Sequence, residues 1–428
     1  SNTLPLWCSY IIKNNTDQEG NPICYYKNTN DFVVPSEASQ IILANCSNFM
    51  IQNLSINNMI KGIEIAFSHH GQIHKNRFTH NQNSINVIHS SDITIYNNTL
   101  INNSEESIGI TLENDCNIDI HKNTISHTIN GIIGGYISNS TIYHNNITTN
   151  HPNGIVIGLE VTYNVSVYEN ILSKGTYGLY VTGYNNSIYQ NNVTNNYLGI
   201  ALMGSNNTVF RNQVADNQEY GLYLTSFSNN SVYENNIVNN TIGIYLYSGW
   251  YQGTSSYNYF YHNNFDNIEN VYEEGDSINF WNKSYPYCGN YWSDYDEPEE
   301  GAYDEYTGCY QNIPGSDGIA DTPYNISEDG ETQDKYPLMH PYPNSFFIRG
   351  DCNGDRTINP ADYTYLQDYL YNNGPQPVGI DMQPNMNSGD LNDDNQVTSD
   401  DLTYLDDFLS GGTPPLPPYP LPGVDPTP

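Results

Sequence analysis

The sequence predicts a mainly β fold, a right-handed parallel β-helix of about ten coils, and three observations support this fold class. First, one six-residue motif recurs ten times between residues 50 and 265: an apolar residue, an aromatic residue, any residue, an asparagine, any residue and an apolar residue. Second, the asparagines of this motif are 21 to 25 residues apart, and 28 apart at the last step. Third, the segments between them are rich in β-branched residues and lack the 3.6-residue period of helical repeats. A fixed period of this length is typical of a solenoid.

The repeated asparagine defines one position on every coil. Asn and Gly tolerate the left-handed backbone of tight corners, so we expect this position at a corner. Identical residues of successive coils lie above one another, and their amides should form a ladder that satisfies corner backbone groups. An apolar residue stands three before each asparagine, beginning with Met50, and another stands two after it, with Ser55 as the exception. The column contains Asn53, Asn76, Asn98, Asn123, Asn145, Asn170, Asn191, Asn212, Asn235 and Asn263.

An aromatic ring is common two residues before each asparagine of the column. Because side chains of a strand alternate between its faces, these rings should point outward and stack along the solenoid. Ordinary ring stacking on a sheet face explains such a stripe, and so does a platform that binds sugar or docks a subunit. The ring stripe consists of His74, Tyr96, His121, Tyr143, Tyr168, Tyr189, Phe210, Tyr233 and Tyr261.

We expect five segments along the chain. Residues 1–47 form an N-terminal cap with the first coils, residues 48–268 the β-helix repeats, and residues 269–345 an irregular, disulfide-pinned cap of the last coil. Residues 346–412 form a small α-helical module, and residues 413–428 a Pro-rich tail. Solenoids need caps because a terminal coil otherwise exposes the core.

Acidic residues dominate the charge of the chain. The sequence has 47 Asp and Glu against 12 Lys and Arg, a formal net charge of −35. This balance disfavours nucleic acid and anionic membranes as partners. The sequence shows no initiator Met, signal peptide or membrane-spanning apolar run, so we expect a mature secreted protein at the cell surface, without membrane insertion. From Tyr287 onward, 26 acidic residues stand against 3 basic ones, which favours a bound cation such as calcium.

Asn-X-Ser/Thr sequons also favour an extracellular location. An asparagine-rich sequence produces some of them by chance, but five of the 15 lie six residues before an asparagine of the column. These five, which we call the sequon column, are Asn139, Asn164, Asn185, Asn206 and Asn229. N-linked glycans there would cover one face of the solenoid. The remaining sequons are Asn14, Asn45, Asn53, Asn97, Asn102, Asn146, Asn192, Asn239, Asn282 and Asn325.

Seven cysteines are consistent with an oxidising compartment without fixing the pairs. The local choices are Cys8 with Cys24 and Cys288 with Cys309. Cys24 with Cys46 is an alternative, because the two lie 22 residues apart and so on adjacent coils. At least one cysteine stays unpaired, with Cys116 and Cys352 as candidates.

The strongest chemical signal is a twelve-residue loop pattern that occurs twice, 39 residues apart. Oxygen-bearing side chains stand at loop positions 1, 3, 5, 9 and 12, and a backbone carbonyl is expected at position 7. This is the spacing with which an EF-hand loop surrounds calcium, so we expect two ions. Two features depart from it: position 12 is Asp rather than Glu, and position 6 is Arg356 or Asn395 rather than Gly. The candidate ligands are Asp351, Asn353, Asp355, Thr357, Asn359 and Asp362, then Asp390, Asn392, Asp394, Gln396, Thr398 and Asp401.

A helix should follow each loop, over residues 363–371 and 402–409. The helix sequences Asp-Tyr-Thr-Tyr-Leu-Gln-Asp-Tyr-Leu and Asp-Leu-Thr-Tyr-Leu-Asp-Asp-Phe-Leu are duplicates of each other. Over roughly residues 349–412, the paired loops and helices resemble a dockerin, the calcium-dependent module that docks into a cohesin domain. The resemblance implies that loop positions 10 and 11 contact the partner. These residues are Pro360, Ala361, Ser399 and Asp400.

The β-helical part resembles the NosD-like family, whose members are common on archaeal surfaces. The resemblance spans about residues 20–340 and rests on Gly-Asn-Pro-Ile-Cys-Tyr-Tyr from Gly20 and on Asp-Gly-Ile-Ala-Asp-Thr-Pro-Tyr from Asp317. It implies a fold more than an activity, since β-helices serve many functions.

Together these patterns predict a secreted, N-glycosylated, calcium-binding structural protein. We expect it to assemble head to tail, through the module and the tail, into an extracellular filament or surface layer, because a contact between two different surfaces need not close on itself. The partner is then a neighbouring copy or a cohesin-like domain. Alternatives are an adhesion protein that binds polysaccharide and, less favoured, a polysaccharide-active enzyme. We expect no catalytic residues, since cations such as Lys75, Arg77 and Lys122 flank no paired carboxylates.

Overall fold

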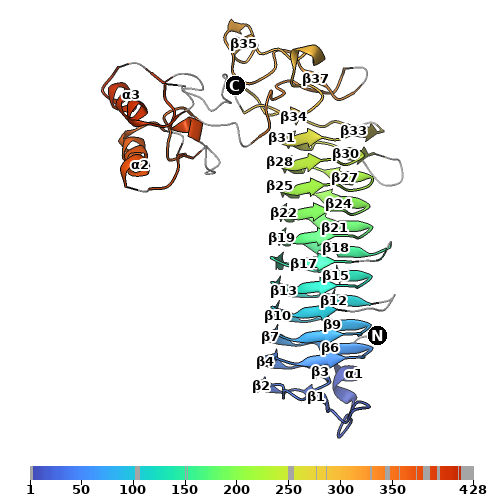
Figure 1. Cartoon of the computed structure of the whole chain (residues 1–428). Helices are drawn as coiled ribbons and strands as arrows, with labels where there is room; N and C mark the ends of the chain where they lie inside the picture. Colours follow the sequence, from blue (N-terminus) through green and yellow to red (C-terminus); the bar gives the residue numbers. More distant parts are fainter. Residues whose placement is uncertain are drawn as a thin grey trace. The chain divides into compact units, whose positions relative to one another are not determined.

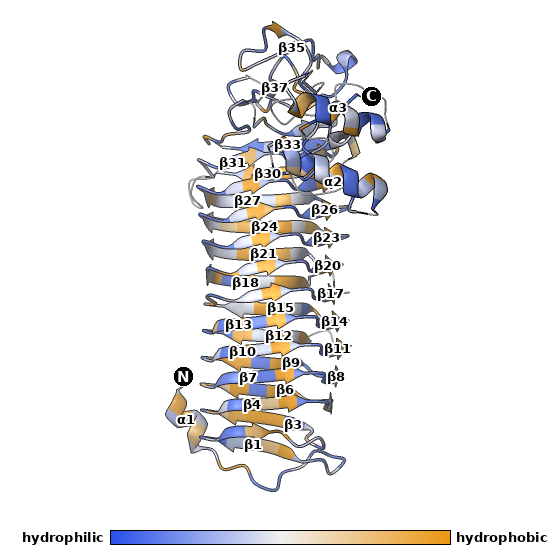
Figure 2. Ribbon diagram, turned by 90° about the vertical axis from the view of Figure 1, so that its left-hand side faces the viewer, coloured by the Kyte–Doolittle hydropathy of each residue, from blue (hydrophilic) through white to orange (hydrophobic). Residues whose placement is uncertain are grey.

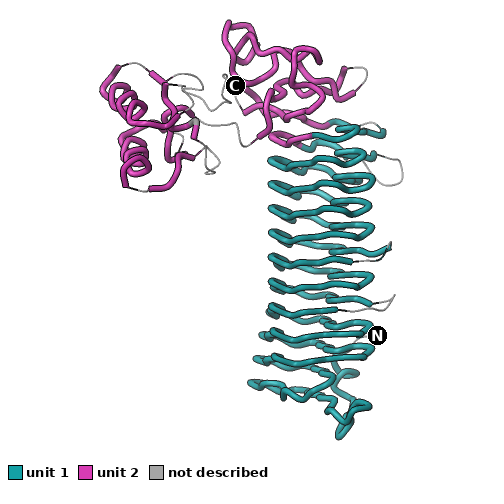
Figure 3. Tube along the Cα trace, viewed as in Figure 1, with its two compact units in different colours: residues 1–258, 266–278 teal, residues 259–265, 279–428 magenta. Residues whose placement is uncertain are grey.

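A computed structural model describes residues 3–101, 107–149, 151, 153–248, 255–275, 277–285, 287–327, 330–342, 348–355, 357–372, 374–378, 386–392, 396–412 and 414–415. The chain divides into two compact units (Figure 3). The first contains Ser1–Asn258 and Asp266–Ile278, and the second contains Tyr259–Phe265 and Asn279–Pro428. The finer division into five segments stays a prediction.

The first unit is a parallel β-helix whose coils each contribute a strand to three sheets (Figure 1). The first sheet contains β1 (Ile23–Lys27), β3 (Gln40–Ala44), β6 (Lys61–Ala66), β9 (Asn83–Ile88), β12 (Ile108–Glu113), β15 (Asn130–Gly135), β18 (Ile155–Tyr163), β21 (Tyr177–Tyr184), β24 (Leu198–Ser205), β27 (Tyr220–Ser228), β30 (Ile242–Tyr247) and β33 (Glu269–Glu274). In this unit the second contains β2 (Asn30–Val33), β4 (Ser47–Gln52), β7 (His69–His74), β10 (Ser91–Tyr96), β13 (Cys116–His121), β16 (Thr141–Tyr143), β19 (Ser166–Tyr168), β22 (Ser187–Tyr189), β25 (Thr208–Phe210) and β28 (Ser231–Tyr233). The third contains β5 (Ser55–Asn57), β8 (Arg77–Thr79), β11 (Thr99–Ile101), β14 (Thr124–Ser126), β17 (Asn146–Thr148), β20 (Ile171–Ser173), β23 (Asn192–Thr194), β26 (Gln213–Ala215) and β29 (Asn236–Val238). A short helix, α1 (Leu4–Ser9), precedes them.

Apolar columns form the core of the β-helix, as the repeat predicts. Hydrophobic residues recur at matching places along successive strands (Figure 2). Within the second sheet, the column that begins Ile51, Ile73 and Ile95 is fully buried. Each neighbour above and below presents a similar β-branched side chain, which allows close packing along the column. The parallel β-helix predicted from the period is confirmed.

The structure corrects one detail of the predicted repeat, at its first copy in β4 and β5. Strand pairing places Ile51, not Met50, beside Ile73, and Ile56 beside Phe78. The residue in the asparagine column is therefore Leu54, whose backbone N–H donates to Oδ1 of Asn76 at 3.0 Å. Asn53 instead occupies an exposed corner with a φ of +57°. With this one-residue shift, the exception at Ser55 disappears, because Ile56 fills the apolar position.

The amide ladder is confirmed from Asn76 to Asn235. Its repeating unit is clear at Asn145, whose Oδ1 accepts from the backbone N–H of Asn123 and from its Nδ2, both at 3.0 Å. The Nδ2 of Asn145 donates to the carbonyl of Ile120 at 2.9 Å and to Oδ1 of Asn170 at 3.0 Å. Two further ladders, not expected from the sequence, run through Asn186, Asn207, Asn230 and Asn258 and through Asn196, Asn217, Asn240 and Asn267.

The second unit begins with an irregular segment that contains short strands. These are β31 (Tyr259–Tyr261), β32 (Asn264–Asp266), β34 (Tyr291–Trp292), β35 (Tyr306–Thr307), β36 (Ile313–Pro314), β37 (Tyr324–Asn325) and β38 (Gln333–Asp334), with the 3-10 helix η1 (Pro298–Glu300). Its hydrophobic cluster joins Cys288, Ile319, Leu338 and Tyr342. Asp334 ends a short ladder here: it accepts from the backbone N–H of Asn290 at 2.7 Å and from Nε1 of Trp292 at 3.1 Å.

The module that follows contains α2 (Pro360–Tyr371), the 3-10 helix η2 (Met386–Ser388) and α3 (Ser399–Leu409). Both predicted helices are confirmed, and each begins three residues earlier than expected, because a capping box starts it at Asn359 or Thr398. Cys352, Leu366, Leu391, Leu402 and Leu405 form its core. None of the described helices is long and apolar enough to cross a membrane.

The predicted disulfides are wrong: all seven cysteines lie in described parts of the chain, and none of them forms a disulfide. Cys288 is buried in a hydrophobic cluster, whereas Cys309 is exposed. The Cys8 thiol donates to Oδ1 of Asn28 at 3.7 Å, at the far end of β1 from Cys24. With a strand rise of about 3.3 Å per residue, these two sites are about 13 Å apart, too far for a bond. Packing, rather than a disulfide, holds the cap.

Candidate calcium centre

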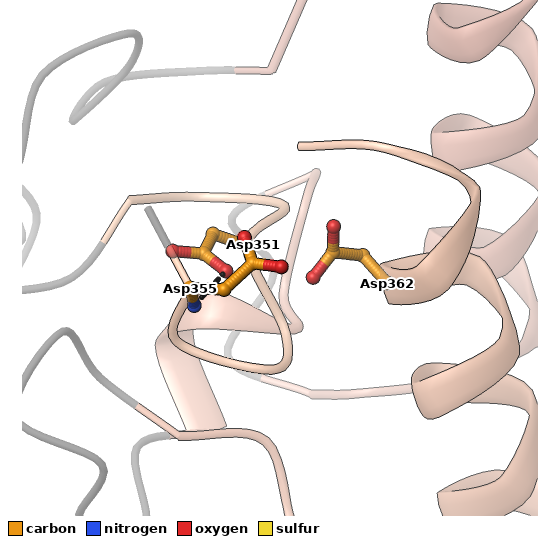
Figure 4. A group of neighbouring side chains, drawn as sticks. All are labelled: Asp351, Asp355 and Asp362. Carbon is orange, nitrogen blue, oxygen red and sulfur yellow. Dashed lines mark hydrogen bonds between the residues drawn. The ribbon is translucent and has the colours of Figure 1, made fainter. Parts of the chain in front are cut away.

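The first loop of the module brings three carboxylates together (Figure 4). Asp351 and Asp355 lie in the loop before α2, and Asp362 lies in the first turn of α2. An oxygen of each lies within 4.8 Å of an oxygen of the other two. Asp351 and Asp362 are buried, and Asp355 is exposed. This is an all-oxygen donor set of the kind that a hard cation such as calcium prefers.

Backbone amides shape the first loop around these carboxylates. The N–H of Asp355 donates to Oδ1 of Asp351 at 3.1 Å and to Oδ1 of Asn353 at 2.9 Å. The N–H of Thr357 donates to Oδ1 of Asp355 at 2.9 Å. Asp362 accepts from the N–H groups of Asn353, at 3.1 Å, and Asn359, at 2.9 Å. The carboxylates at loop positions 1, 5 and 12 therefore lie close together, and their role as calcium ligands stays a prediction.

The pKa of Asp362 is raised to about 6, chiefly by burial and to a smaller extent by the negative charges of Asp351 and Asp355, although two backbone N–H groups oppose the rise. Carboxylates in mutual repulsion favour either a proton or a cation. At neutral pH, a cation between the three oxygens would remove this repulsion. The donor set thus fits calcium.

The second loop repeats the first. Asp401 accepts from the N–H groups of Asn392, at 3.3 Å, and Thr398, at 2.8 Å, matching the contacts of Asp362 39 residues earlier. Burial likewise raises the pKa of Asp401, and the charge of Asp390 contributes. Asp390 is 3% exposed, while Gln396 is exposed. Asp394, the predicted ligand at position 5, lies outside the described residues.

Loop position 9 serves the helices in this structure. Oδ1 of Asn359 accepts from the N–H of Ala361 at 2.8 Å, and Oγ1 of Thr398 accepts from the N–H of Asp400 at 3.2 Å. These side chains are the N-caps of α2 and α3. In EF-hand loops, position 9 often reaches the ion through water, which is compatible with a capping role. The carbonyl of Thr357, expected at position 7, accepts from Nδ2 of Asn359 at 2.9 Å.

The four predicted partner contacts occupy the first turns of α2 and α3. Pro360, Ala361, Ser399 and Asp400 are all exposed. Each pair directly precedes a buried loop aspartate, Asp362 or Asp401. The geometry of the loops therefore fixes the position of this surface. Of the predicted tail, only residues 414–415 are described; there Tyr404 donates its hydroxyl to the carbonyl of Pro414 at 3.1 Å.

One residue of the centre was missed by the sequence analysis. Arg349 is fully buried, and its guanidinium donates to the backbone carbonyl of Asp390. The signal is its position: it is one of only three basic residues after Tyr287 and stands two residues before the first loop.

Nearly all described sequon asparagines are exposed. Asn282 is half-buried, its Oδ1 accepting from the N–H of Lys335 at 3.1 Å, and Asn102 lies outside the described residues. The five asparagines of the sequon column are exposed corner residues with φ between +49° and +59°. The exposed set is Asn14, Asn45, Asn53, Asn97, Asn139, Asn146, Asn164, Asn185, Asn192, Asn206, Asn229, Asn239 and Asn325.

The ring stripe is stacked from His74 to Tyr233, as predicted. Neighbouring centroids are 4.6 to 5.2 Å apart, and ring planes differ by 2° to 14°. Each ring therefore covers the faces of its neighbours, and mainly edges remain for contact. A sugar that stacks on aromatic faces finds few free ones here. This arrangement favours the ordinary structural explanation of the stripe.

The chain matches known families in both of its parts. It matches the family described as periplasmic copper-binding protein (NosD) over residues 8–198 and 157–297, and the dockerin type I domain over residues 349–410. No curated protein matches the chain. Copper is not supported by the donor atoms: among the described residues, the only cluster of three potential metal-ligating side chains is Asp351, Asp355 and Asp362. These oxygens suit calcium, whereas copper favours nitrogen and sulfur ligands.

Two kinds of solved structure are similar in fold. A mutant of the periplasmic alginate epimerase AlgG has 15% identity and a TM-score of 0.46, with 55% of this chain and 65% of the epimerase covered. DFA-IIIase from Arthrobacter chlorophenolicus A6 in complex with GF2 has 15% identity and a TM-score of 0.41, covering 46% and 56%. The chain thus spans less than two thirds of either structure. Since the NosD match extends over more than half of the sequence, the chain belongs to the NosD family of parallel β-helix proteins and carries a dockerin type I domain at its C-terminal side.

Proposed function

We propose that the chain is a secreted, N-glycosylated, calcium-binding structural protein of the extracellular surface. Its dockerin module, with the tail of residues 413–428, would attach to the next copy head to tail and build a filament or surface layer. The observation that carries this proposal is the carboxylate centre of the first loop, with the buried Asp390 and Asp401 in the second, beside the exposed first turns of α2 and α3. Such a centre makes a protein contact depend on calcium.

Calcium would act through the position of the two helices. Asp362 and Asp401 each belong to a loop and to the first turn of a helix, so an ion held by the loop also holds the helix start. Without a cation, the carboxylates of Asp351, Asp355 and Asp362 repel one another. The exposed turns that carry Pro360, Ala361, Ser399 and Asp400 are then less firmly placed. Binding of the ion would therefore hold the docking surface in place.

The β-helix supports a structural role for the rest of the chain. Its three columns of buried apolar residues and its amide ladders run unbroken over many coils. Every coil is tied to the next by backbone and side-chain hydrogen bonds, which makes a rigid spacer. The exposed sequon column would carry sugar along one side of this spacer and leave other sides for contact.

Two other functions of the chain can be tested against this proposal. A cohesin-like domain of another protein would make the chain a tethered surface component instead of a polymer. A tethered polysaccharide-binding protein or a tethered enzyme would use the β-helix for recognition. The mutually covered ring faces of the ring stripe disfavour the polysaccharide-binding protein. Neither function changes the role of calcium at the module.

The decisive experiment is electron microscopy of native material with and without a chelator. In calcium, we expect long assemblies, and in excess EDTA we expect single particles that reassemble when calcium is restored. The variant D362N should reduce assembly in calcium, because it removes a shared carboxylate. The matched control D406N changes an exposed aspartate of α3 outside the loops and should assemble normally.

Intact fibres in excess EDTA would rule out calcium-held assembly. Isolated particles in calcium, together with capture of a second protein through the module, would favour the cohesin-like partner. Release of sugar from an acidic polysaccharide by the purified protein would favour the enzyme.

A further inference from the structure

Four large apolar side chains gather at the corner between the first and second sheets. Tyr136 is 64% exposed, Val161 52%, Tyr163 44% and Tyr184 52%. Strand pairing places Tyr163 directly beside Tyr184, and the N–H of Tyr136 donates to the carbonyl of the residue before Val161 at 2.9 Å. We call these four residues the corner cluster. Apolar side chains exposed side by side mark an interaction surface.

A bulge in β18 builds the corner cluster. The register between β18 and β21 shifts between Leu159 and Thr162, and Val161 has a φ of +54°. A β-branched residue rarely takes this left-handed conformation. The N–H of Val161 holds the bulge by donating to Oγ1 of Thr182 at 2.9 Å. The bulge leaves Thr162 fully buried and Tyr163 exposed. The strained backbone therefore occurs at a site that exposes apolar side chains, as is common at functional sites.

Three asparagines of the sequon column border the corner cluster. Asn164 directly follows Tyr163, and Asn185 directly follows Tyr184. On the coil below, the N–H of Asn139 donates to the carbonyl of Tyr163 at 3.1 Å. All three asparagines are exposed and lie at the same corner as the rings. A sugar on any of them would begin next to an exposed tyrosine.

The tyrosines of the corner cluster offer open ring faces. The centroids of Tyr163 and Tyr184 are 5.2 Å apart, and their planes are inclined by 53°. Planes in the ring stripe differ by 14° at most, so that each ring covers the next. An inclined pair leaves faces uncovered, and the negative face of an aromatic ring attracts the polarised C–H groups on the apolar side of a pyranose. The cluster therefore suits a neutral sugar.

We propose that the corner cluster is the docking surface of the chain's own N-linked glycans, attached at Asn139, Asn164 and Asn185. The first sugars lie over the tyrosine rings and Val161 and shield them from water. This proposal rests on the glycosylation included in the proposed function and adds the surface on which the sugar rests. Of the other members of the sequon column, Asn206 follows Ser205, which pairs with Tyr184 on the neighbouring coil. Asn229 follows Ser228, one coil farther from the tyrosines, and provides the matched control.

The test compares the native glycosylated protein with two variants made in the same source cells, N139Q/N164Q/N185Q and the control N229Q. Hydroxyl-radical footprinting with peptide mass spectrometry measures oxidation of Tyr163 and Tyr184, and glycopeptide analysis gives the occupancy of each asparagine. We expect oxidation of the two rings to rise several-fold in the triple variant and to stay unchanged in N229Q. Unchanged oxidation of Tyr168, within the ring stripe, shows that the fold is intact.

Equal oxidation of Tyr163 and Tyr184 in the native protein and the triple variant overturns the proposal, whether the rings are open in both or covered by another protein in both. Absence of sugar from all three asparagines overturns it too. In that case, sugar at Asn206 or Asn229 leaves the glycosylation of the proposed function standing, whereas an entirely unglycosylated chain removes both. Chelator-dependent assembly is independent of either result.

Discussion

The β-helix and the dockerin module bury polar side chains by opposite means. In the β-helix, the buried polar groups are mostly neutral amides such as Asn145, whose side chain accepts from Asn123 on one neighbouring coil and donates to Asn170 on the other. In the module they are carboxylates: Asp351, Asp362, Asp390 and Asp401 are each at most 3% exposed. An amide with all its hydrogen bonds needs nothing further, but grouped buried carboxylates need a counter-charge. The β-helix therefore needs no ion, whereas we propose that calcium supplies the counter-charge in the module.

Removal of calcium should produce the largest difference in stability between the β-helix and the module. In EDTA, we expect the amides of α2 and α3 to lose protection in hydrogen exchange, while amides of the β-helix keep theirs. A ligand at a thousand times its Kd stabilises the folded form by about 4 kcal/mol, which is enough to decide whether so small a module stays folded. Hydrogen exchange with mass spectrometry resolves both regions in one sample.

Calcium added back in excess provides the control and should restore protection. If α2 and α3 stay protected in EDTA, the module is stable without an ion and the contrast with the β-helix fails. If β-helix amides lose protection as well, calcium acts on a site outside the module.

Truncation of one ladder amide tests the other side of the comparison. N145A leaves the backbone N–H of Asn123 without its acceptor and removes the donor to the Ile120 carbonyl. A buried group without a partner costs about 1–3 kcal/mol, so we expect a loss of about 2–4 kcal/mol in the free energy of unfolding. The neighbouring variant N146A, at an exposed asparagine of β17, should change it by about 0.5 kcal/mol or less. Denaturant unfolding of unglycosylated protein provides the measurement; equal effects would contradict a ladder role.

The sequence predicts the β-helix because its physical cause is periodic. Every coil needs the same apolar and amide side chains at the same places, so the same pattern occurs ten times in the sequence. Even so, the first copy is misaligned by one residue, because Asn53 at an exposed corner imitates the ladder position that Leu54 occupies. The ladder through Asn186 and Asn207 is missed because each follows a sequon asparagine and looks like part of that motif.

The module is predictable for a different reason: its candidate ligands are close in sequence, so spacing alone brings Asp351, Asp355 and Asp362 together. Contacts between distant segments do not show in spacing. Cys288 and Cys309 look paired by distance along the chain, yet one joins a buried cluster and the other lies at the surface. The bulge at Val161 is likewise invisible, since nothing local in the sequence marks a valine with positive φ.

The cap contains an intermediate case that sharpens the comparison, because there a single carboxylate ends a ladder of amides. Asn263 donates its N–H to Oδ1 of Asn290 at 3.1 Å, and Asn290 donates its N–H to Asp334. Burial raises the pKa of Asp334 to about 7, although four hydrogen bonds from Asn290, Trp292 and Tyr336 oppose the rise. The carboxyl group of an unfolded chain titrates near pH 3.9.

The folded cap therefore holds the proton of Asp334 more tightly than the unfolded chain does. Its stabilising contribution is complete below about pH 4 and is lost as the pH rises to about 7. We expect hydrogen exchange around Leu338, whose N–H donates to the Asn290 carbonyl at 2.8 Å, to be slower at pH 5 than at pH 8 after correction for intrinsic rates. The difference should be on the order of 1 kcal/mol and should vanish in D334N but persist in D321N. The module should respond in the opposite direction, because its carboxylates must be deprotonated to hold calcium. A cap that weakens with acid, together with the module, would show that Asp334 is ionised throughout and that the amide ladder ends on a charge.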